Sequence, residues 1–331
     1  MISRREWIRI TAGAGAAVTF GGCRGDANAE GAASAAGADT QSGEMILRSI
    51  PSSGARIPVI GLGGRWISAD ASAEELADHR AVLNALAEGA EGAGRVFDTA
   101  AGYGGGGSET YAGEWAQQDG TADDIFWATK VNAARRGGGE ADPADVRAQI
   151  ERSFERLRID VIDLNQVHNM GDPPTQLRIL QEYKDQGRIR YIGITTTSSG
   201  EYADLAQVMR DHPIDFIGID YAVDNLAVEE TILPLAEERE IGVLVYAPFG
   251  RTRLWDRVRG QEVPAWAAEF DATSWAQFFL KFVVAHPAVT AATPATSRPH
   301  HMVDNMGAAK GRLPDAAERR RMVAHVAALP G

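Results

Sequence analysis

The sequence predicts a (β/α)8 TIM barrel preceded by a β-hairpin, and three observations support that fold class. Apolar runs of strand length alternate with longer amphipathic segments along most of the 331 residues. The alternation yields eight candidate strands, which is the number that closes such a barrel. Side chains that can take part in acid–base chemistry follow several of these strands, as expected where strand C-termini open onto one face.

The elements follow from the apolar runs and their spacing. The expected strands are Val59–Leu62, Arg95–Thr99, Ile125–Val131, Val161–Val167, Ile189–Thr195, Phe216–Tyr221, Gly242–Tyr246 and Val289–Ala292. The expected helices are Ala73–Ala87, Glu109–Gln117, Pro143–Leu157, Thr175–Gln186, Glu201–Arg210, Glu229–Glu238 and Thr273–His286. Ser108 is expected to cap the second of these helices. Asp142 and Pro143 provide a cap and a first-turn proline for the third.

A β-hairpin is expected ahead of the first barrel strand. Met45–Ser49 and Arg56–Pro58 flank the turn sequence Pro-Ser-Ser-Gly, and we expect this hairpin to cover the bottom of the barrel. The alternative fold is an open doubly wound sheet with a G-x-G-x-x-G turn after its first strand. Trp66 stands where the third glycine belongs, and Gly104 to Gly107 lack the Lys-Ser/Thr of a phosphate loop, so both fingerprints fail.

Composition excludes some functions. The formal net charge is −12 and hydrophobic residues make up 44% of the chain, which is ordinary for a globular protein with a full core. A nucleic-acid-binding protein needs a concentrated basic surface, so no nucleic-acid partner is expected. The basic run Arg319 to Arg321 is interpreted as the solvent face of a C-terminal helix. Residues 45–331 are interpreted as one barrel domain.

The N-terminus has the layout of an export signal. Arg4 and Arg5 precede a short apolar run, and the pair resembles the twin-arginine export signal, so residues 1–23 are expected to engage the export machinery. The run is shorter than the roughly 20 residues that span a bilayer. Residues 24–44 are rich in Ala, Gly and Ser and are interpreted as a flexible tether. The expected location is the periplasmic side.

Two ways of processing this signal remain open. Cys23 follows Phe20-Gly21-Gly22, which resembles a lipoprotein cleavage site, and lipidation of Cys23 would anchor the chain to the membrane. Ala27-Asn28-Ala29 is a competing site that would release a soluble protein. Cys23 is the only cysteine, so the domain after it has no internal disulfide.

Four residues at strand ends form the candidate catalytic group. Asp98 and Tyr103 lie in FDTAAGY, Lys130 ends FWATK, and His168 ends DLNQVH. A phenol has a pKa of about 10, and a nearby ammonium makes it a better proton donor. We expect Lys130 to assist Tyr103 in this way, Asp98 to keep Lys130 charged, and His168 to align a carbonyl oxygen. Such a set suits the reduction of an aldehyde or ketone by hydride, or the reverse oxidation of an alcohol.

These residues resemble the aldo-keto reductase family over about Ile46 to Gly307. The segments that carry the resemblance are GLGGRW, FDTAAGYGGGGSETYAG, ATK, SFERLRIDVIDLNQVHN, RIRYIGIT, VYAPFG and TPATSRPHHMVDNMGA, in the family's order. The resemblance implies a (β/α)8 barrel, dependence on NADPH, and Tyr103 as proton donor supported by Asp98, Lys130 and His168.

The resemblance also implies a cofactor site. Its expected residues are Gly63, Gly64, Arg65, Asp98, Thr195, Thr196, Tyr246, Pro248, Phe249, Gly250, Ser297, Arg298 and Asn305. Among these, Tyr246 matches the aromatic residue that stacks on the nicotinamide, and Asn305 matches the residue that contacts the adenine. The expected substrate-binding residues are Trp66, Tyr103, His168 and Asn169.

Several positions depart from the family pattern. Thr195-Thr196 replace the usual Ser-Asn, Gly218 replaces a Gln, and Ala295 and His301 replace the basic residues that bind a 2′-phosphate. Arg298 remains and suits a phosphate, so the sequence favours NADP(H) over NAD(H).

Two other functions compete with carbonyl reduction. The altered carboxamide site and the export signal motivate an exported sensor or accessory protein that binds nucleotide with little turnover. A metal-dependent hydrolase needs clustered histidines and carboxylates, and no histidine precedes His79, so no metal is expected. The adjacent His300 and His301 diverge on a helix and are interpreted as surface residues.

Overall fold

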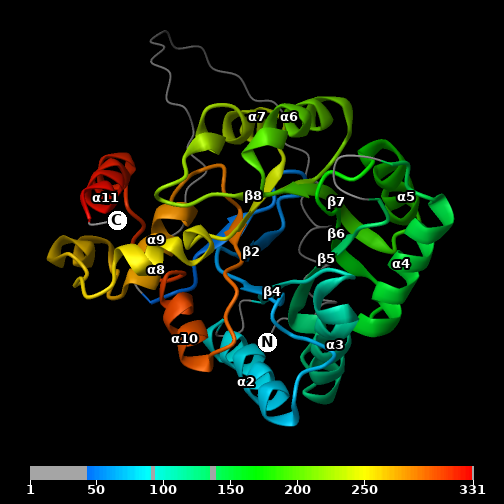
Figure 1. The fold of residues 1–331 in the computed structure, drawn as a ribbon, viewed down its shortest axis with the longest axis horizontal. Coiled ribbons are helices and arrows are strands. Elements are labelled where there is room, and N and C mark those ends of the chain that lie inside the picture. The colour runs from blue at the N-terminus through cyan, green and yellow to red at the C-terminus, as the bar shows by residue number, and fades with distance from the viewer. Residues whose placement is uncertain (1–42, 91–93, 135–138, 330–331) are drawn as a thin grey trace, which may run out of the picture.

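The computed structural model describes residues 43–90, 94–134 and 139–329, and this part of the chain forms the predicted (β/α)8 barrel. The strands of the main sheet follow one another in sequence order from β3 to β10, and each neighbouring pair is parallel. Parallel bridges between Ile60 and Ala292 and between Gly63 and Ala295 join the first strand to the last. Figure 1 shows the helices arranged around the strands. The expected export signal, Cys23 and almost all of the tether lie outside the described residues.

The barrel strands match the predicted runs closely. They are β3 (Leu62–Gly63), β4 (Arg95–Asp98), β5 (Ile125–Val131), β6 (Ile162–Val167), β7 (Ile189–Thr196), β8 (Phe216–Asp220), β9 (Gly242–Tyr246) and β10 (Ala291–Ala292). β3 shares only Leu62 with its predicted run, and β10 begins two residues later than predicted. Only isolated bridges join these two strands across the seam where the barrel closes. The amphipathic segments form the surrounding helices, whose apolar faces pack on the sheet.

The helices are α2 (Ala73–Gly89), α3 (Gly107–Gln118), α4 (Pro143–Leu157), α5 (Pro173–Asp185), α6 (Tyr202–Asp211), α7 (Ile232–Glu238), α8 (Arg253–Arg257), α9 (Trp275–Val284), α10 (Pro299–Gly307) and α11 (Ala316–Ala328). Asp142 caps α4 through the amide of Ala144, as predicted. None of the helices in the described ranges is long and apolar enough to cross a membrane.

The expected cap at Ser108 is wrong. α3 begins at Gly107, so Ser108 lies inside the helix and is buried. Its hydroxyl accepts a hydrogen bond from Thr99 Oγ1 at 2.7 Å and donates one to the carbonyl of Gly64 at 2.8 Å. The glycines at 104–106 adopt left-handed backbone angles and turn the chain into the helix earlier than the sequence pattern indicated.

The N-terminal hairpin covers the bottom of the barrel, as predicted. β1 (Leu47–Ser49) pairs antiparallel with β2 (Arg56–Pro58). Ile50, Ala55 and Ile57 pack into one apolar cluster with inward-facing strand residues. The strand members of that cluster are Val96, Phe126, Ala128, Leu164, Tyr191, Phe216, Leu244 and Ala291. This apolar cluster fills the lower part of the barrel interior and leaves the upper part to other side chains.

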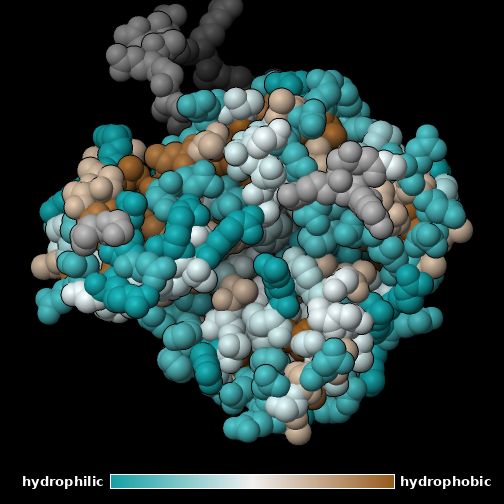
Figure 2. Space-filling model, in the orientation of Figure 1, coloured by the Kyte–Doolittle hydropathy of each residue, from teal (hydrophilic) through white to brown (hydrophobic). Residues whose placement is uncertain are grey.

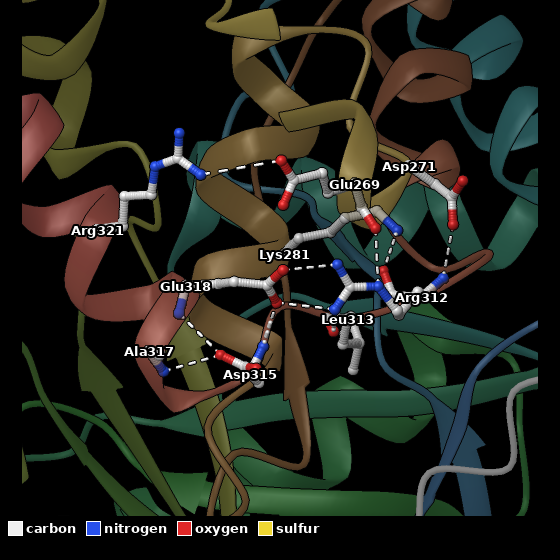
Figure 3. A network of polar contacts seen from close by, with 9 residues as sticks. All are labelled: Glu269, Asp271, Lys281, Arg312, Leu313, Asp315, Ala317, Glu318 and Arg321. Carbon is white, nitrogen blue, oxygen red and sulfur yellow. Dashed lines mark hydrogen bonds and ion pairs between the residues drawn. The ribbon is translucent and has the colours of Figure 1, made fainter. Parts of the chain in front are cut away.

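Polar contacts connect the C-terminal helix to the barrel, as Figure 3 shows. Arg312 bonds both carboxylate oxygens of Glu318 on α11, and its amide donates to Asp271. The ammonium of Lys281 on α9 donates to the carbonyls of Lys310 at 2.6 Å and Arg312 at 2.9 Å. The segment between α10 and α11 is therefore held by a buried amine on one side and by carboxylates on the other.

Candidate active site

A layer of polar side chains lies above the apolar cluster inside the barrel. Side chains alternate across a strand, so the residue two positions after an inward-facing residue also faces inward. Val96, Ala128, Leu164, Phe216, Leu244 and Ala291 all belong to the apolar cluster. The next inward positions are Asp98, Lys130, Gln166, Gly218, Tyr246 and Thr293. Strand pleating thus collects the polar residues at the C-terminal end of the barrel, the end where barrel enzymes carry their sites.

Lys130 and Asp98 form a buried ion pair at the centre of this layer. The ammonium lies 2.5 Å from Asp98 Oδ1 and also donates to the carbonyl of Thr99 at 2.7 Å. Both side chains are almost fully buried. An isolated buried ammonium or carboxylate would be costly, so each partner offsets part of the cost of burying the other.

Tyr103 lies on a loop that holds its ring beside Lys130. The ammonium is 5.2 Å from the centre of the Tyr103 ring. Gly104, next in the chain, has a φ of +56°, and a Cβ there would lie 2.0 Å from the carbonyl of Ile67, so only glycine fits. The close contact with Ile67 therefore fixes the loop backbone, and with it the position of the Tyr103 phenol.

His168 faces Tyr103 from the end of β6. Its ring makes an edge-to-face contact with the Tyr103 ring, with centres 5.6 Å apart. Asn169 follows with a left-handed backbone conformation, and its backbone N–H donates to Thr195 Oγ1 at 3.2 Å. The four residues predicted from the strand ends are thus brought together at one rim, as the sequence indicated.

Tyr246 adds a second phenol to the group. Its hydroxyl donates to Asp98 Oδ2 at 3.1 Å and accepts from Gln166 Nε2 at 2.9 Å. Lys130 Nζ lies 4.8 Å from the centre of its ring. Burial and the nearby Asp98 carboxylate raise the pKa of Tyr246 well above its ordinary value, so it remains a protonated donor. Burial also raises the pKa of Asp98, and the Lys130 ammonium opposes that rise.

A hollow of about 940 Å³ opens above these residues. Asp98, Tyr103, Lys130 and His168 line it, together with Asn169, Thr195 and Tyr246. Figure 2 shows a hollow near the centre of this largely hydrophilic face. Thr293 also lines it, and its buried hydroxyl has no hydrogen-bond partner among the described residues. A hydroxyl left in this state is available to a bound molecule.

A second hollow of about 380 Å³ adjoins the first. Phe249, Trp255 and Ala295 line both, so the two form an elongated depression. Asn305, almost fully buried on α10, lines its far end beside His301. The joined hollows, with the hydroxyl of Thr293 in one and the buried amide of Asn305 in the other, have room and polar groups for a dinucleotide.

Most of the expected cofactor residues lie along this depression. Gly63, Arg65 and Pro248 line the first hollow. Gly250 follows Phe249 directly, and its carbonyl accepts from Arg253 at 2.8 Å. Ser297 and Arg298 are exposed at the start of α10, where Arg298 lies 3.7 Å from Asp78.

Three expected contacts do not match the positions of the residues. Trp66 packs its ring on His79 of α2, with centres 4.4 Å apart, and does not line the hollow. The hydroxyl of Thr196 donates to Glu201 rather than facing the hollow. Gly64 is buried against Phe97, where a Cβ would lie 2.5 Å from the ring. Alternation along a strand explains Thr196, because Thr195 faces the interior and its neighbour cannot.

Several residues of the site were missed from the sequence. Gln166 precedes His168 by two positions, so the strand period alone would have placed it on the same face. Glu109 and Arg156 hold the Tyr103 loop from behind: Arg156 donates to the carbonyl of Ala101 at 2.9 Å and to Glu109 at 3.2 Å. They contact each other across two helices, and no pattern within either helix indicates that.

Comparison with known proteins gives a consistent result. The model of the aldo/keto reductase family matches residues 60–322. The chain is 35% identical over 172 residues to aldo-keto reductase str7 of Strobilurus tenacellus, covering 50% of this chain and 49% of that protein. It is 30% identical over 207 residues to aldo-keto reductase yakc [NADP(+)] of Schizosaccharomyces pombe, covering 59% of each. The matched region spans about half to three fifths of these relatives.

Solved structures show the same fold. Aldo-keto reductase AKR11C1 from Bacillus halodurans, in its holo form, has a TM-score of 0.69 at 24% identity, covering 86% of this chain and 96% of its own. An aldo-keto reductase from Klebsiella pneumoniae in complex with NADPH has a TM-score of 0.69 at 23% identity, covering 85% and 96%. The family match spans most of the barrel and includes the four strand-end residues. The chain therefore belongs to the aldo/keto reductase family.

Proposed function

We propose that this protein is an NADP(H)-dependent oxidoreductase that reduces an aldehyde or ketone to an alcohol, or catalyses the reverse. The observation that carries the proposal is the position of Lys130, whose ammonium is paired with buried Asp98 and lies beside the Tyr103 ring at the base of an open hollow. A phenol, an ammonium and an imidazole that converge on one cavity are the groups that carbonyl reduction needs.

Each side chain has a defined task in this mechanism. NADPH, when bound, supplies the hydride. Tyr103 donates its hydroxyl proton to the carbonyl oxygen, and Lys130 stabilises the negative charge that develops on the phenol oxygen. The His168 ring donates a hydrogen bond to the same carbonyl oxygen and so aligns the carbonyl group. Asp98 keeps Lys130 charged and fixes its direction.

The elongated depression would hold the cofactor. The face of Tyr246 and the polar groups of Thr195, Asn169 and Thr293 surround the end near the catalytic residues. Asn305 lies at the other end for the adenine. Arg298, exposed at the start of α10, would bind a 2′-phosphate, which favours NADP(H) over NAD(H). The NADP(+) in the name of the fission-yeast relative supports the same assignment.

The test of the activity is turnover by purified protein. NADPH oxidation with a panel of aldehydes and ketones should proceed over many cycles, and Tyr103→Phe should lower kcat/KM by about 10²–10⁴-fold. Tyr111→Phe is the matched control, because that ring stacks on Trp115 and does not line the hollow. Unchanged activity in Tyr103→Phe would remove the proton-donor assignment. Tight nucleotide binding without any turnover would support the sensor function instead.

The test of the cofactor assignment compares two nucleotides. Arg298→Ala should raise the Kd for NADPH by about tenfold or more, since a hydrogen bond to a charged group contributes about 1.5–3 kcal/mol. The Kd for NADH should stay the same, because it has no 2′-phosphate. An equal loss of affinity for NADPH and NADH in Arg298→Ala would exclude a contact between Arg298 and the 2′-phosphate.

We also propose that residues 1–23 direct export to the periplasmic side. The paired Arg4 and Arg5 before a short apolar run support this, and Cys23 offers a site for lipidation. Cell fractionation of the full chain should find the protein outside the cytoplasm, and Arg4→Lys with Arg5→Lys should retain it inside. Cys23→Ser should release membrane-bound protein if lipidation anchors it. An unchanged distribution of the double variant would contradict the export proposal.

A further inference from the structure

The hydroxyl of Tyr246 connects two buried polar residues under the hollow. It donates to Asp98 Oδ2 at 3.1 Å and accepts from Gln166 Nε2 at 2.9 Å. Asp98 Oδ1 is already bonded to Lys130. Each oxygen of the buried carboxylate therefore has its own donor, and the carboxylate plane is fixed by two contacts from different strands.

Gly218 gives the Tyr246 ring the room it needs. A Cβ at position 218 would lie 2.3 Å from Tyr246 Cε2 and 2.8 Å from its hydroxyl oxygen. Real Cβ atoms do not approach that closely, so the ring occupies the space that any side chain at 218 would take. Residue 218 has an ordinary backbone conformation, so the close approach of the ring, and not the backbone, requires glycine here.

We propose that Tyr246 is a positioning residue whose hydroxyl fixes the Asp98 carboxylate and so aims Lys130 at Tyr103, and that Gly218 permits this arrangement. The proposal rests on the function proposed above and goes beyond it, because it gives the hydroxyl of Tyr246 a task separate from the face of its ring. Lys130 Nζ is close to both phenols, 5.2 Å from the centre of the Tyr103 ring and 4.8 Å from the centre of the Tyr246 ring. A rotation of the carboxylate would shift the ammonium relative to the Tyr103 ring.

The first test removes only the hydroxyl. Tyr246→Phe keeps the ring, so the Kd for NADPH should change less than about twofold, while kcat should fall by about tenfold, the usual effect of one buried hydrogen bond. The pH profile of kcat should move by about 0.5–1 unit, because the Asp98–Lys130 pair sets the charge beside the proton donor. A purely structural role would not move the profile, so an unchanged profile with unchanged kcat overturns the proposal.

Tyr191→Phe is the matched control for that variant. Tyr191 also points into the barrel, but at the bottom, where its hydroxyl lies 2.8 Å from Ser53 Oγ. Loss of the Tyr191 hydroxyl should lower Tm without altering kcat or the pH profile of kcat. Equal effects of the two substitutions on the profile would mean that any buried phenol in the barrel acts alike, which contradicts a specific role for Tyr246.

The second test needs no cofactor or substrate. Thermal unfolding of the free protein is measured for wild type, Tyr246→Phe, Asp98→Asn and the double variant. If the hydroxyl holds the carboxylate, the Tm loss of the double variant should be clearly smaller than the sum of the single losses. Additive losses overturn the contact. This result stands even if no carbonyl substrate is turned over, so failure of the proposed function is distinguishable from failure of this inference.

The third test concerns Gly218. Gly218→Ala should displace the Tyr246 ring, lowering kcat at least as much as Tyr246→Phe and also weakening NADPH binding. In a Tyr246→Ala background the ring is absent, so adding Gly218→Ala should cause no more than about a twofold further change. A large further loss in that background would show that the glycine serves another purpose, and would remove its part of the proposal.

Discussion

At the scale of single residues, the site depends on a buried ion pair at the base of the hollow. Lys130 and Asp98 are nearly fully buried, and each makes one further hydrogen bond: Lys130 to the carbonyl of Thr99, and Asp98 from the hydroxyl of Tyr246. Taking two charges out of water is costly, and only good geometry with added hydrogen bonds offsets that cost. Such an arrangement is hard to explain by stability alone, but it suits a site that needs a fixed positive charge next to a proton donor.

Lys130→Met should destabilise the protein strongly. The substitution leaves the Asp98 carboxylate buried without its cation, and breaking a buried pair in this way costs about 3–5 kcal/mol. The free energy of unfolding, measured by urea denaturation, should fall by that amount. The double variant with Asp98→Asn removes the leftover charge, so it should regain much of the stability but none of the activity. A double variant as unstable as Lys130→Met alone would contradict this account.

How far the sequence reveals the site differs between residues. Asp98, Lys130 and His168 were predictable because each ends an apolar run, and strand ends meet at one rim. Thr196 was misplaced because adjacent residues of a strand face opposite ways. Arg156 and Glu109 were not predictable, since they meet only through the packing of α4 against α3. Gly218 was noted as a missing amide, but the ring that fills its space is visible only in three dimensions.

At the scale of elements, α4 holds the loop that carries Tyr103. Arg156, near the C-terminal end of α4, donates to the carbonyl of Ala101, pairs with buried Glu109 of α3 and packs on Gly106. A Cβ at Gly106 would lie 2.4 Å from the guanidinium carbon, so the loop backbone rests directly on this side chain. A helix outside the barrel thus fixes the position of the proton donor.

Arg156→Gln should therefore lower activity without touching the hollow. Displacing a catalytic group by about 1 Å can cost about 10²-fold in rate, so kcat should drop by up to that factor while the Kd for NADPH stays the same. Steady-state kinetics and nucleotide titration would measure both. Arg158→Gln is the control, because its pair with Glu114 is largely exposed and contributes at most about 1 kcal/mol. Equal losses of kcat in the two variants would rule out a specific role for Arg156.

A buried amine on α9 makes part of the fold sensitive to pH. Burial lowers the pKa of Lys281 to about 8, and the Asp271 carboxylate opposes this only in part. In the unfolded chain this amine keeps its proton up to its ordinary pKa of 10.5. Between these two values the unfolded state binds more protons, so this residue makes the protein more stable as the pH rises from about 8 towards 10.5. The neutral amine still donates to the carbonyls of Lys310 and Arg312. Figure 3 shows Lys281 beside Arg312.

Lys281→Met should remove that dependence. Below pH 8 the substitution removes two hydrogen bonds, which is unfavourable, and a buried charge, which is favourable. Above pH 8 the wild type becomes more stable as the amine loses its proton, and the variant has no such gain. The difference in free energy of unfolding between wild type and variant should widen in favour of wild type between about pH 7 and pH 10. Parallel pH curves for the two proteins would show that Lys281 does not titrate in this range.

At the scale of the whole molecule, the barrel separates stability from chemistry. The alternating pattern of apolar runs was enough to predict the fold and nearly all strand bounds, because both barrel closure and helix packing follow from burial of those runs. The hairpin and the apolar cluster occupy the bottom of the interior, while the polar layer and the hollow occupy the top. Only the seam was less regular than predicted, because few residues bridge it.

Ile50→Ala should separate the two ends of the barrel experimentally. Ile50 is fully buried in the apolar cluster, and removing so much side chain from a packed core costs about 2–5 kcal/mol. The urea midpoint should fall accordingly, while kcat and the Kd for NADPH at 25 °C should match wild type, because the cavity lies at the opposite end from the hollow. Val303→Ala, at an exposed position of α10, should leave the midpoint nearly unchanged. Loss of kcat in Ile50→Ala under conditions where the variant is fully folded would show that the bottom of the barrel transmits its packing to the catalytic residues.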